Sequence, residues 1–134
     1  MFHLDVMSRM PVYEQIIDEL ERFILTGVIK PRDQLPSVRG LSVELSINPN
    51  TILKAYNELD SRKIIFSVPG KGYFVCEDAL ESLKKEKMKG LPSIKEQIAQ
   101  LALAGVEKKV LFSCVEQAYE LANRMREERG ENDD

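Results

Sequence analysis

The sequence contains few of the residues that enzymes and metal proteins rely on. Its 134 residues include one histidine, His3, two cysteines, Cys76 and Cys114, and no tryptophan. Two cysteines are too few for a disulfide scaffold, and with one histidine they do not complete a four-ligand zinc site within one chain. A nucleophile–base pair would have to use His3, close to the start of the chain. We therefore expect no enzymatic activity, no metal and no cofactor, and we interpret both cysteines as small, partly buried residues.

Long apolar runs are also absent. No stretch of about 18 apolar residues occurs, so we expect no membrane-spanning helix. Residues 1–10 lack the basic and apolar regions of a signal peptide. The composition, 43% hydrophobic and 31% charged, is typical of a soluble folded protein. We expect this protein to be cytoplasmic.

Basic charge is scarce overall but locally concentrated. The formal net charge is −3 at pH 7, which argues mildly against nucleic acid as a partner. The stretch from Lys30 to Lys71, however, contains seven basic residues and four acidic ones. Because the distribution of charge matters more than its sum, this stretch is the candidate for contacts with nucleic acid.

The clearest helix is predicted for Pro11–Thr26, since proline suits a first helical turn and Gly27 follows as a stop signal. Upstream, Phe2–Val6 alternates apolar and polar residues, which indicates a short strand or an extended arm. The helix places its apolar residues at the spacing of one buried face. They are Tyr13, Ile16, Ile17, Leu20, Phe23 and Ile24. Tyr13 could contact a ligand, but we favour core packing.

Two shorter helices should follow. Ser37 suits the N-cap of a helix at Ser37–Leu45, and Asn48 suits the N-cap of a helix at Pro49–Arg62. The second of these should bury Ile52, Ala55, Tyr56 and Leu59. At 100° per residue, Asn50, Lys54 and Asn57 project from its opposite side. This geometry matches a helix-turn-helix whose recognition helix lies in the DNA major groove, or else an ordinary solvated helix.

A hairpin directly after these helices favours the DNA-binding interpretation. Ile64–Phe66 and Tyr73–Val75 have the composition of strands, and Pro69–Gly72 forms the turn between them. Its glycines allow backbone conformations closed to other residues and hold Lys71 at the tip, close to a phosphate or a minor groove. The sequence therefore predicts a mainly α fold with a small β-hairpin, a winged helix-turn-helix at residues 1–78.

Residues 79–134 are predicted to be a helical dimerisation tail. Glu77–Lys89 is charged and helix-permissive, and Gly90–Pro92 should bend or break it, which leaves open whether 79–105 is one bent helix or two. Ser93–Glu96 resembles a capping box that starts a new helix. The last helix, at about 106–128, has a wide apolar stripe: Val106, Val110, Leu111, Cys114, Val115, Ala118, Leu121, Ala122 and Met125.

A stripe of this size needs a partner surface. The partner could be the winged helix of the same chain, but we favour a second copy and hence a homodimer. The tail lacks a sheet that could form a conventional small-molecule pocket. Whether a small-molecule effector binds at the dimer interface is left open by the sequence.

Three motifs in order resemble the GntR family of bacterial transcriptional regulators, and Pro11–Ile16 with the short tail resembles its YtrA subfamily. The motifs are Leu35–Arg39, Asn48–Thr51 with Ala55–Tyr56 and Glu58–Leu59, and Gly70–Val75. The resemblance implies a repressor that binds an inverted-repeat operator in double-stranded DNA. The residues we expect to bind DNA are Ser37, Arg39, Asn48, Asn50, Thr51, Lys54, Asn57, Gly70, Lys71 and Gly72.

The sequence departs from the family pattern at Pro49, Leu53 and Gly40, and at Ser67–Pro69, which replaces a usually more basic approach to the wing. Many GntR proteins have arginines where this chain has Pro49 and Leu53, so fewer contacts between guanidinium groups and guanine are expected. Gly40 replaces a frequent glutamate, and glycine within a helix costs about 0.5–1 kcal/mol relative to alanine.

The alternative function is a winged-helix module that binds proteins without DNA specificity.

Overall fold

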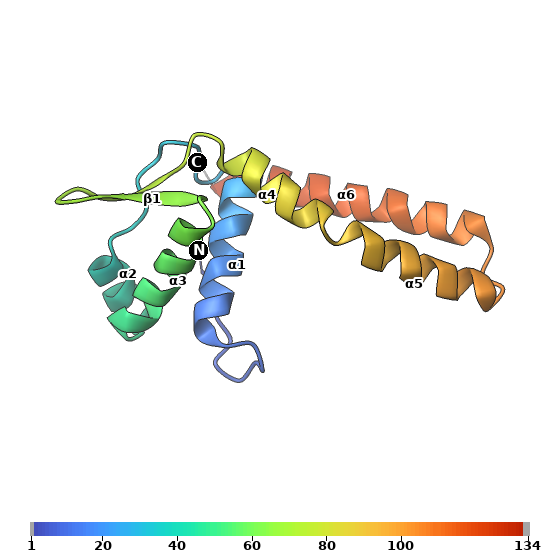
Figure 1. Ribbon diagram of the computed structural model, residues 1–134, viewed down its shortest axis with the longest axis horizontal. Helices are drawn as coiled ribbons and strands as arrows, with labels where there is room; N and C mark the ends of the chain where they lie inside the picture. The colour runs from blue at the N-terminus through green and yellow to red at the C-terminus, as the bar shows by residue number, and fades with distance from the viewer. Residues whose placement is uncertain (1, 133–134) are drawn as a thin grey trace. The chain divides into compact units, whose positions relative to one another are not determined.

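The computed structural model describes residues 2–132, with side chains described through residue 128. It contains six helices and one hairpin within the described residues (Figure 1). In chain order they are α1 (Val12–Thr26), α2 (Val38–Leu45), α3 (Pro49–Ser61), β1 (Ile65–Val68), β2 (Gly72–Val75), α4 (Ala79–Met88), α5 (Leu91–Leu103) and α6 (Lys108–Asn132).

The chain forms two compact units that divide between Leu83 and Lys84. The division that we expected after residue 78 falls later because Ala79 and Leu83, on the first turns of α4, are fully buried in the core of the first unit. Helix α4 therefore contributes residues to both units.

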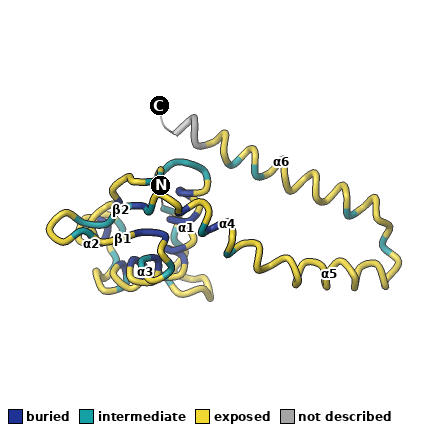
Figure 2. Tube along the Cα trace, turned by 45° about the horizontal axis from the view of Figure 1, so that its top comes forward, coloured by how far each residue is buried: buried dark blue, intermediate teal, exposed yellow. Residues whose placement is uncertain are grey.

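The core of the first unit lies between α1, α3 and the hairpin, where the buried segments gather in Figure 2. The four residues predicted to form the inner face of α3, Ile52, Ala55, Tyr56 and Leu59, are all fully buried. The α1 stripe is confirmed for all its members except Tyr13, which is only partly buried. The spacing of apolar residues therefore identified the inner faces of both helices correctly.

Both predicted N-caps are present. The Ser37 hydroxyl accepts a hydrogen bond from the Gly40 N–H at 2.9 Å, and the Asn48 side chain accepts one from the Asn50 N–H at 2.8 Å. A Cβ atom at position 40 would lie 2.8 Å from the Ser37 hydroxyl oxygen. A side chain at position 40 would therefore require the Ser37 hydroxyl to shift.

The hairpin is wider than its two strands. Strands β1 and β2 pair antiparallel with Phe66 opposite Phe74, and β1 begins one residue later than predicted. The preceding segment 32–35 pairs with the other side of β2. The bonds are Arg32 N–H to Val75 O (2.8 Å), Val75 N–H to Asp33 O (2.9 Å) and Leu35 N–H to Tyr73 O (2.8 Å). Strand β2 is therefore central, and the wing is attached to the chain that leads into α2.

The N-terminal segment is an arm without strand structure at Phe2–Val6. The Phe2 ring packs edge-on against Phe23, with 5.2 Å between the ring centroids. The Gln15 side chain, which is buried, accepts a bond from the Asp5 N–H and donates to the carbonyls of Asp5 and Met10. The arm is thus fixed to α1 by one aromatic contact and one amide.

After the end of α4, the second unit contains α5 and α6, which run in opposite directions from the turn between them (Figure 1). The predicted break after α4 is confirmed at Lys89–Gly90, so 79–105 is two helices. The predicted capping box at Ser93 is wrong. Helix α5 begins at Leu91, with Gly90 as an N-cap that has no side-chain bond, because Pro92 fits a first helical turn.

Two further expectations for this unit need correction. Helix α6 begins at Lys108, so Val106 lies in the preceding turn. Cys114, predicted to be partly buried, is exposed, whereas Cys76 in the first unit is partly buried as expected.

None of the helices in the described residues has the length and apolar character needed to cross a membrane.

Replacing Tyr56 by phenylalanine should destabilise the first unit. The buried Tyr56 hydroxyl donates to the Pro36 carbonyl at 2.7 Å. Its burial raises the pKa of the phenol, so it remains a donor at ordinary pH. We expect Tyr56→Phe to lower the free energy of unfolding by about 1 kcal/mol, measured as a lower urea midpoint at unchanged m-value.

Tyr13→Phe is the matched control, because the Tyr13 hydroxyl bonds at the surface to Glu14. It should change stability by less than about 0.5 kcal/mol. Equal losses in the two variants would contradict the role assigned to the Tyr56 hydroxyl.

Candidate nucleic-acid interface

The outer face of α3 is polar with one apolar side chain. Asn50, Leu53, Lys54 and Asn57 are exposed on the side opposite the buried stripe. Leu53 is 38% exposed, although it is hydrophobic. Amide groups can pair with adenine edges, and an apolar group can contact a thymine methyl. This face therefore has the chemistry to read base edges without a guanidinium group.

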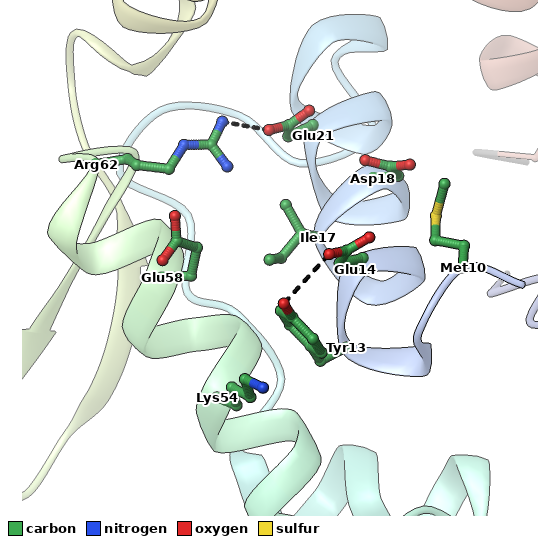
Figure 3. Close-up of a pocket in the computed structure, with 9 residues that line it drawn as sticks. All are labelled: Met10, Tyr13, Glu14, Ile17, Asp18, Glu21, Lys54, Glu58 and Arg62. Atoms are coloured by element: carbon green, nitrogen blue, oxygen red, sulfur yellow. Dashed lines mark hydrogen bonds and ion pairs between the residues drawn. The ribbon is translucent and has the colours of Figure 1, made fainter.

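Lys54 differs from the other residues of this face because its ammonium is already in contact with α1. The Lys54 Nζ atom lies 3.9 Å from the centroid of the Tyr13 ring, and Figure 3 shows the two side chains between the helices. The Tyr13 hydroxyl donates to Glu14 at 3.2 Å, and this bond raises the pKa of the phenol. Tyr13 is partly buried and packs against the core, as the favoured interpretation expected, and its ring also contacts the Lys54 ammonium.

A groove of about 380 Å³ runs between α1 and α3 beside this contact (Figure 3). It is lined by Met10, Tyr13, Glu14, Ile17, Asp18, Glu21, Lys54, Glu58 and Arg62. At the far end from Lys54, Arg62 forms an ion pair with the buried Glu21. The two helices are therefore connected at both ends of an acidic groove, by a cation–ring contact and by an ion pair.

The tip of the wing is fixed by a residue that sequence reasoning missed. The Gln34 side-chain amide donates to the Lys71 carbonyl at 2.7 Å, and the Lys71 N–H donates to the Val68 carbonyl at 2.9 Å. Gly72 has φ 120°, and a Cβ atom there would lie 3.1 Å from the Gln34 amide nitrogen. The position of Lys71 thus depends on Gln34, which only the pairing of segment 32–35 with β2 reveals.

The structure brings the ten predicted DNA-binding residues onto α2, α3 and the wing of one unit (Figure 1). All are exposed except Thr51 and Gly72, which are partly buried. Ser37 and Asn48 use a side-chain oxygen for helix capping, so their availability for DNA is reduced. That these residues bind DNA stays a prediction.

The predicted dimerisation residues lie in the second unit. Val110, Val115 and Leu121 are each about half exposed, at 53%, 50% and 51%. Leu111, Ala122 and Met125 are partly buried, while Cys114 and Ala118 are exposed. Phe112 and Tyr119, which are not part of the predicted stripe, are 67% and 70% exposed on the same helix. This helix therefore presents more apolar surface than its predicted stripe.

Among residues 2–132, no group of three or more His, Cys, Asp or Glu side chains is placed to hold a metal ion.

The sequence and the structure of this chain resemble those of known proteins. Residues 12–75 match the family described as bacterial regulatory proteins, gntR family. The HTH-type transcriptional repressor YtrA of Bacillus subtilis (strain 168) is 40% identical over 121 residues, covering 87% of this chain and 91% of that protein. A transcriptional regulator from Oenococcus oeni has a TM-score of 0.69 at 32% identity, covering 89% of this chain and 99% of that chain.

Solved relatives include complexes with DNA. The DNA-binding domain of AraR in complex with the operator ORE1 has a TM-score of 0.50 at 30% identity. The match covers 55% of this chain and 100% of that domain. The fold predicted from the sequence, a winged helix-turn-helix followed by helices, is confirmed by these relatives and by the elements of the structure.

Removing the Gln34 side chain should loosen the wing tip without unfolding the unit. An exposed hydrogen bond contributes about 0.5–1.5 kcal/mol, so in Gln34→Ala the Lys71 amide should exchange hydrogen about 2- to 10-fold faster. NMR-detected exchange measures this, and amides within α1 should be unaffected. Gln97→Ala, which removes an exposed amide of α5, is the control. Unchanged exchange at Lys71 would show that Gln34 does not hold the tip.

Proposed function

The chain belongs to the gntR family of bacterial regulatory proteins, and we propose that it is a transcriptional repressor that binds an inverted-repeat operator as a homodimer. The observation that carries this proposal is the outer face of α3, whose exposed amides stand opposite a fully buried stripe and beside a wing. Repression is supported by the name of the Bacillus subtilis relative, which this chain resembles over most of both lengths. A repressor of promoter DNA acts in the cytoplasm, where we place this protein.

Each part of the interface has a distinct role in this proposal. The exposed Arg39 guanidinium, on the first turn of α2, neutralises a phosphate or pairs with an adjacent base. Asn50 and Asn57 direct amide groups at base edges in the major groove. Lys71, held at the wing tip by Gln34, approaches the phosphate backbone. Affinity then comes mainly from Arg39 and Lys71, and sequence preference mainly from α3.

The homodimer is supported by the spacing of apolar residues on α6. Leu111, Val115, Ala118, Ala122 and Met125 follow one another at alternating intervals of four and three. This is the seam spacing of helices that pack side by side in coiled coils. Val115 and Ala118 are nevertheless exposed in a single chain. A second copy would remove this seam from water.

Helix α5 adds to the same surface. Leu91, Ile94 and Ile98 are 53%, 51% and 39% exposed and, with Pro92 and Lys95, line an apolar depression of about 500 Å³. We assign this depression to the partner copy and not to a small-molecule effector, because it is continuous with other exposed apolar residues of α5 such as Leu101.

Substitutions at Arg39 and Asn50 should separate affinity from sequence preference. Selection from a random duplex library should enrich a palindrome with the wild-type chain. Arg39→Ala should weaken binding to all sequences and lower the slope of log K against log salt by about 0.9 for each phosphate that the protein no longer neutralises. Asn50→Ala should relax preference at one base pair by about 1–3 kcal/mol.

Arg22→Ala, which removes an exposed guanidinium from α1, is the matched control and should change neither quantity. If Arg39→Ala and Asn50→Ala both leave affinity and preference unchanged, α2 and α3 do not dock on DNA as proposed. Failure of the wild-type chain to bind any duplex, with recovery of a stoichiometric protein partner, would favour a protein-interaction module.

A charge in the α6 seam should dissociate the dimer. Val115→Glu places a carboxylate where the proposed partner is apolar, so the dimer dissociation constant should rise at least about tenfold. Sedimentation measures it at several concentrations. Glu116→Gln changes the neighbouring charge outside the seam and should leave association intact. A Val115→Glu chain that stays dimeric would place the interface elsewhere.

A further inference from the structure

Lys54 lies at one edge of the face that α3 presents to DNA. Successive helical residues are rotated by 100° around the helix axis, so Asn50 and Asn57 lie within about 20° of each other. Lys54 lies about 40° from Asn50, on the side away from Asn57. The contact with Tyr13 shows that this side faces α1 (Figure 3). The Lys54 ammonium is therefore directed along the protein surface, away from the two asparagines.

The surroundings of Lys54 favour this orientation. The groove it lines contains the carboxylates of Glu14, Asp18 and Glu58. The remaining pair in the groove, Arg62 and Glu21, compensate each other. The Lys54 ammonium thus has a ring below it and an excess of negative charge beside it. A DNA phosphate moving into this groove would be repelled, whereas the ammonium is attracted into it.

We propose that Tyr13 is a specificity-determining residue, whose ring holds the Lys54 ammonium in the groove between α1 and α3 and away from DNA. The proposal rests on the function proposed above. With Lys54 withheld, the outer face of α3 offers neutral groups, the amides of Asn50 and Asn57 and the side chain of Leu53. A released lysine would instead reach guanine acceptors or any phosphate, because Lys contacts both.

The size of the effect follows from the strength of the contact. Exposed cation–π contacts contribute about 0.5–1 kcal/mol, which corresponds to a change of about 2- to 5-fold in the ratio of withheld to released lysine. Replacing the ring should therefore strengthen binding to unrelated DNA by about 2- to 5-fold. The salt slope should steepen by up to about 0.9, the contribution of one additional neutralised phosphate.

The experiment compares two duplexes of equal length and composition, one enriched by the wild-type chain and one scrambled. Affinity for both is measured across a salt series with the full chain. The variants are Tyr13→Leu and Tyr13→Met, which remove the ring, and Tyr13→Phe, which keeps it. Each is also made together with Lys54→Gln. Thermal unfolding confirms that a variant is folded, and the methionine variant serves if the leucine variant is not.

The expected result is a lower ratio of specific to non-specific affinity in the variants without the ring, with Tyr13→Phe behaving as wild type. The change should vanish when Lys54→Gln is present. A purely structural role of Tyr13 would weaken both duplexes alike and would persist without Lys54, which would overturn the proposal. Weaker binding that depends on Lys54 would also overturn it, because Tyr13 would then direct Lys54 toward DNA.

The two hypotheses fail in different ways. A wild-type chain that does not prefer its enriched duplex refutes the proposed function and this inference with it. A wild-type chain with clear preference, and ring-free variants with the same ratio of affinities, refutes only the role of Tyr13.

Discussion

The arrangement of the first unit depends on the contacts of the buried Tyr56 side chain. Its ring lies at the centre of the inner face of α3 and meets the Tyr73 ring of β2 edge-on at 5.0 Å. Its hydroxyl reaches the Pro36 carbonyl, immediately before the N-cap of α2. One side chain therefore contacts all three parts that would approach DNA. Their relative positions are set by core packing, which tolerates little change in volume.

The interface is connected to the rest of the unit by contacts that are chemically different. The wing tip is held by an amide, the middle of α3 by a cation over a ring, and the C-terminal end of α3 by an ion pair with a buried carboxylate. The first two are exposed and contribute little to stability. Their value lies in orientation, because the amide positions the backbone at Lys71 and the ring positions the Lys54 ammonium, while the core determines where the helices lie.

Local signals were sufficient to predict the helices and the hairpin. The caps at Ser37 and Asn48 and the apolar spacing of α3 act over four residues or fewer, so the sequence states them directly. The contacts of Lys54 with Tyr13 and of Gln34 with Lys71 join residues 41 and 37 positions apart, and no local pattern indicates them. The error at Ser93 has a local cause, since a capping box is also compatible with a helix interior once Pro92 occupies the first turn.

The pairing of segment 32–35 with β2 places that segment at one edge of the wing in the described residues, and β1, which leads into the wing tip, at the other edge. That edge is four residues long and is followed by Pro69, which has no N–H to offer a neighbouring chain. Short edges ended by proline resist the addition of foreign strands. The exposed edge of β1 is thereby protected against aggregation by the addition of strands from other chains.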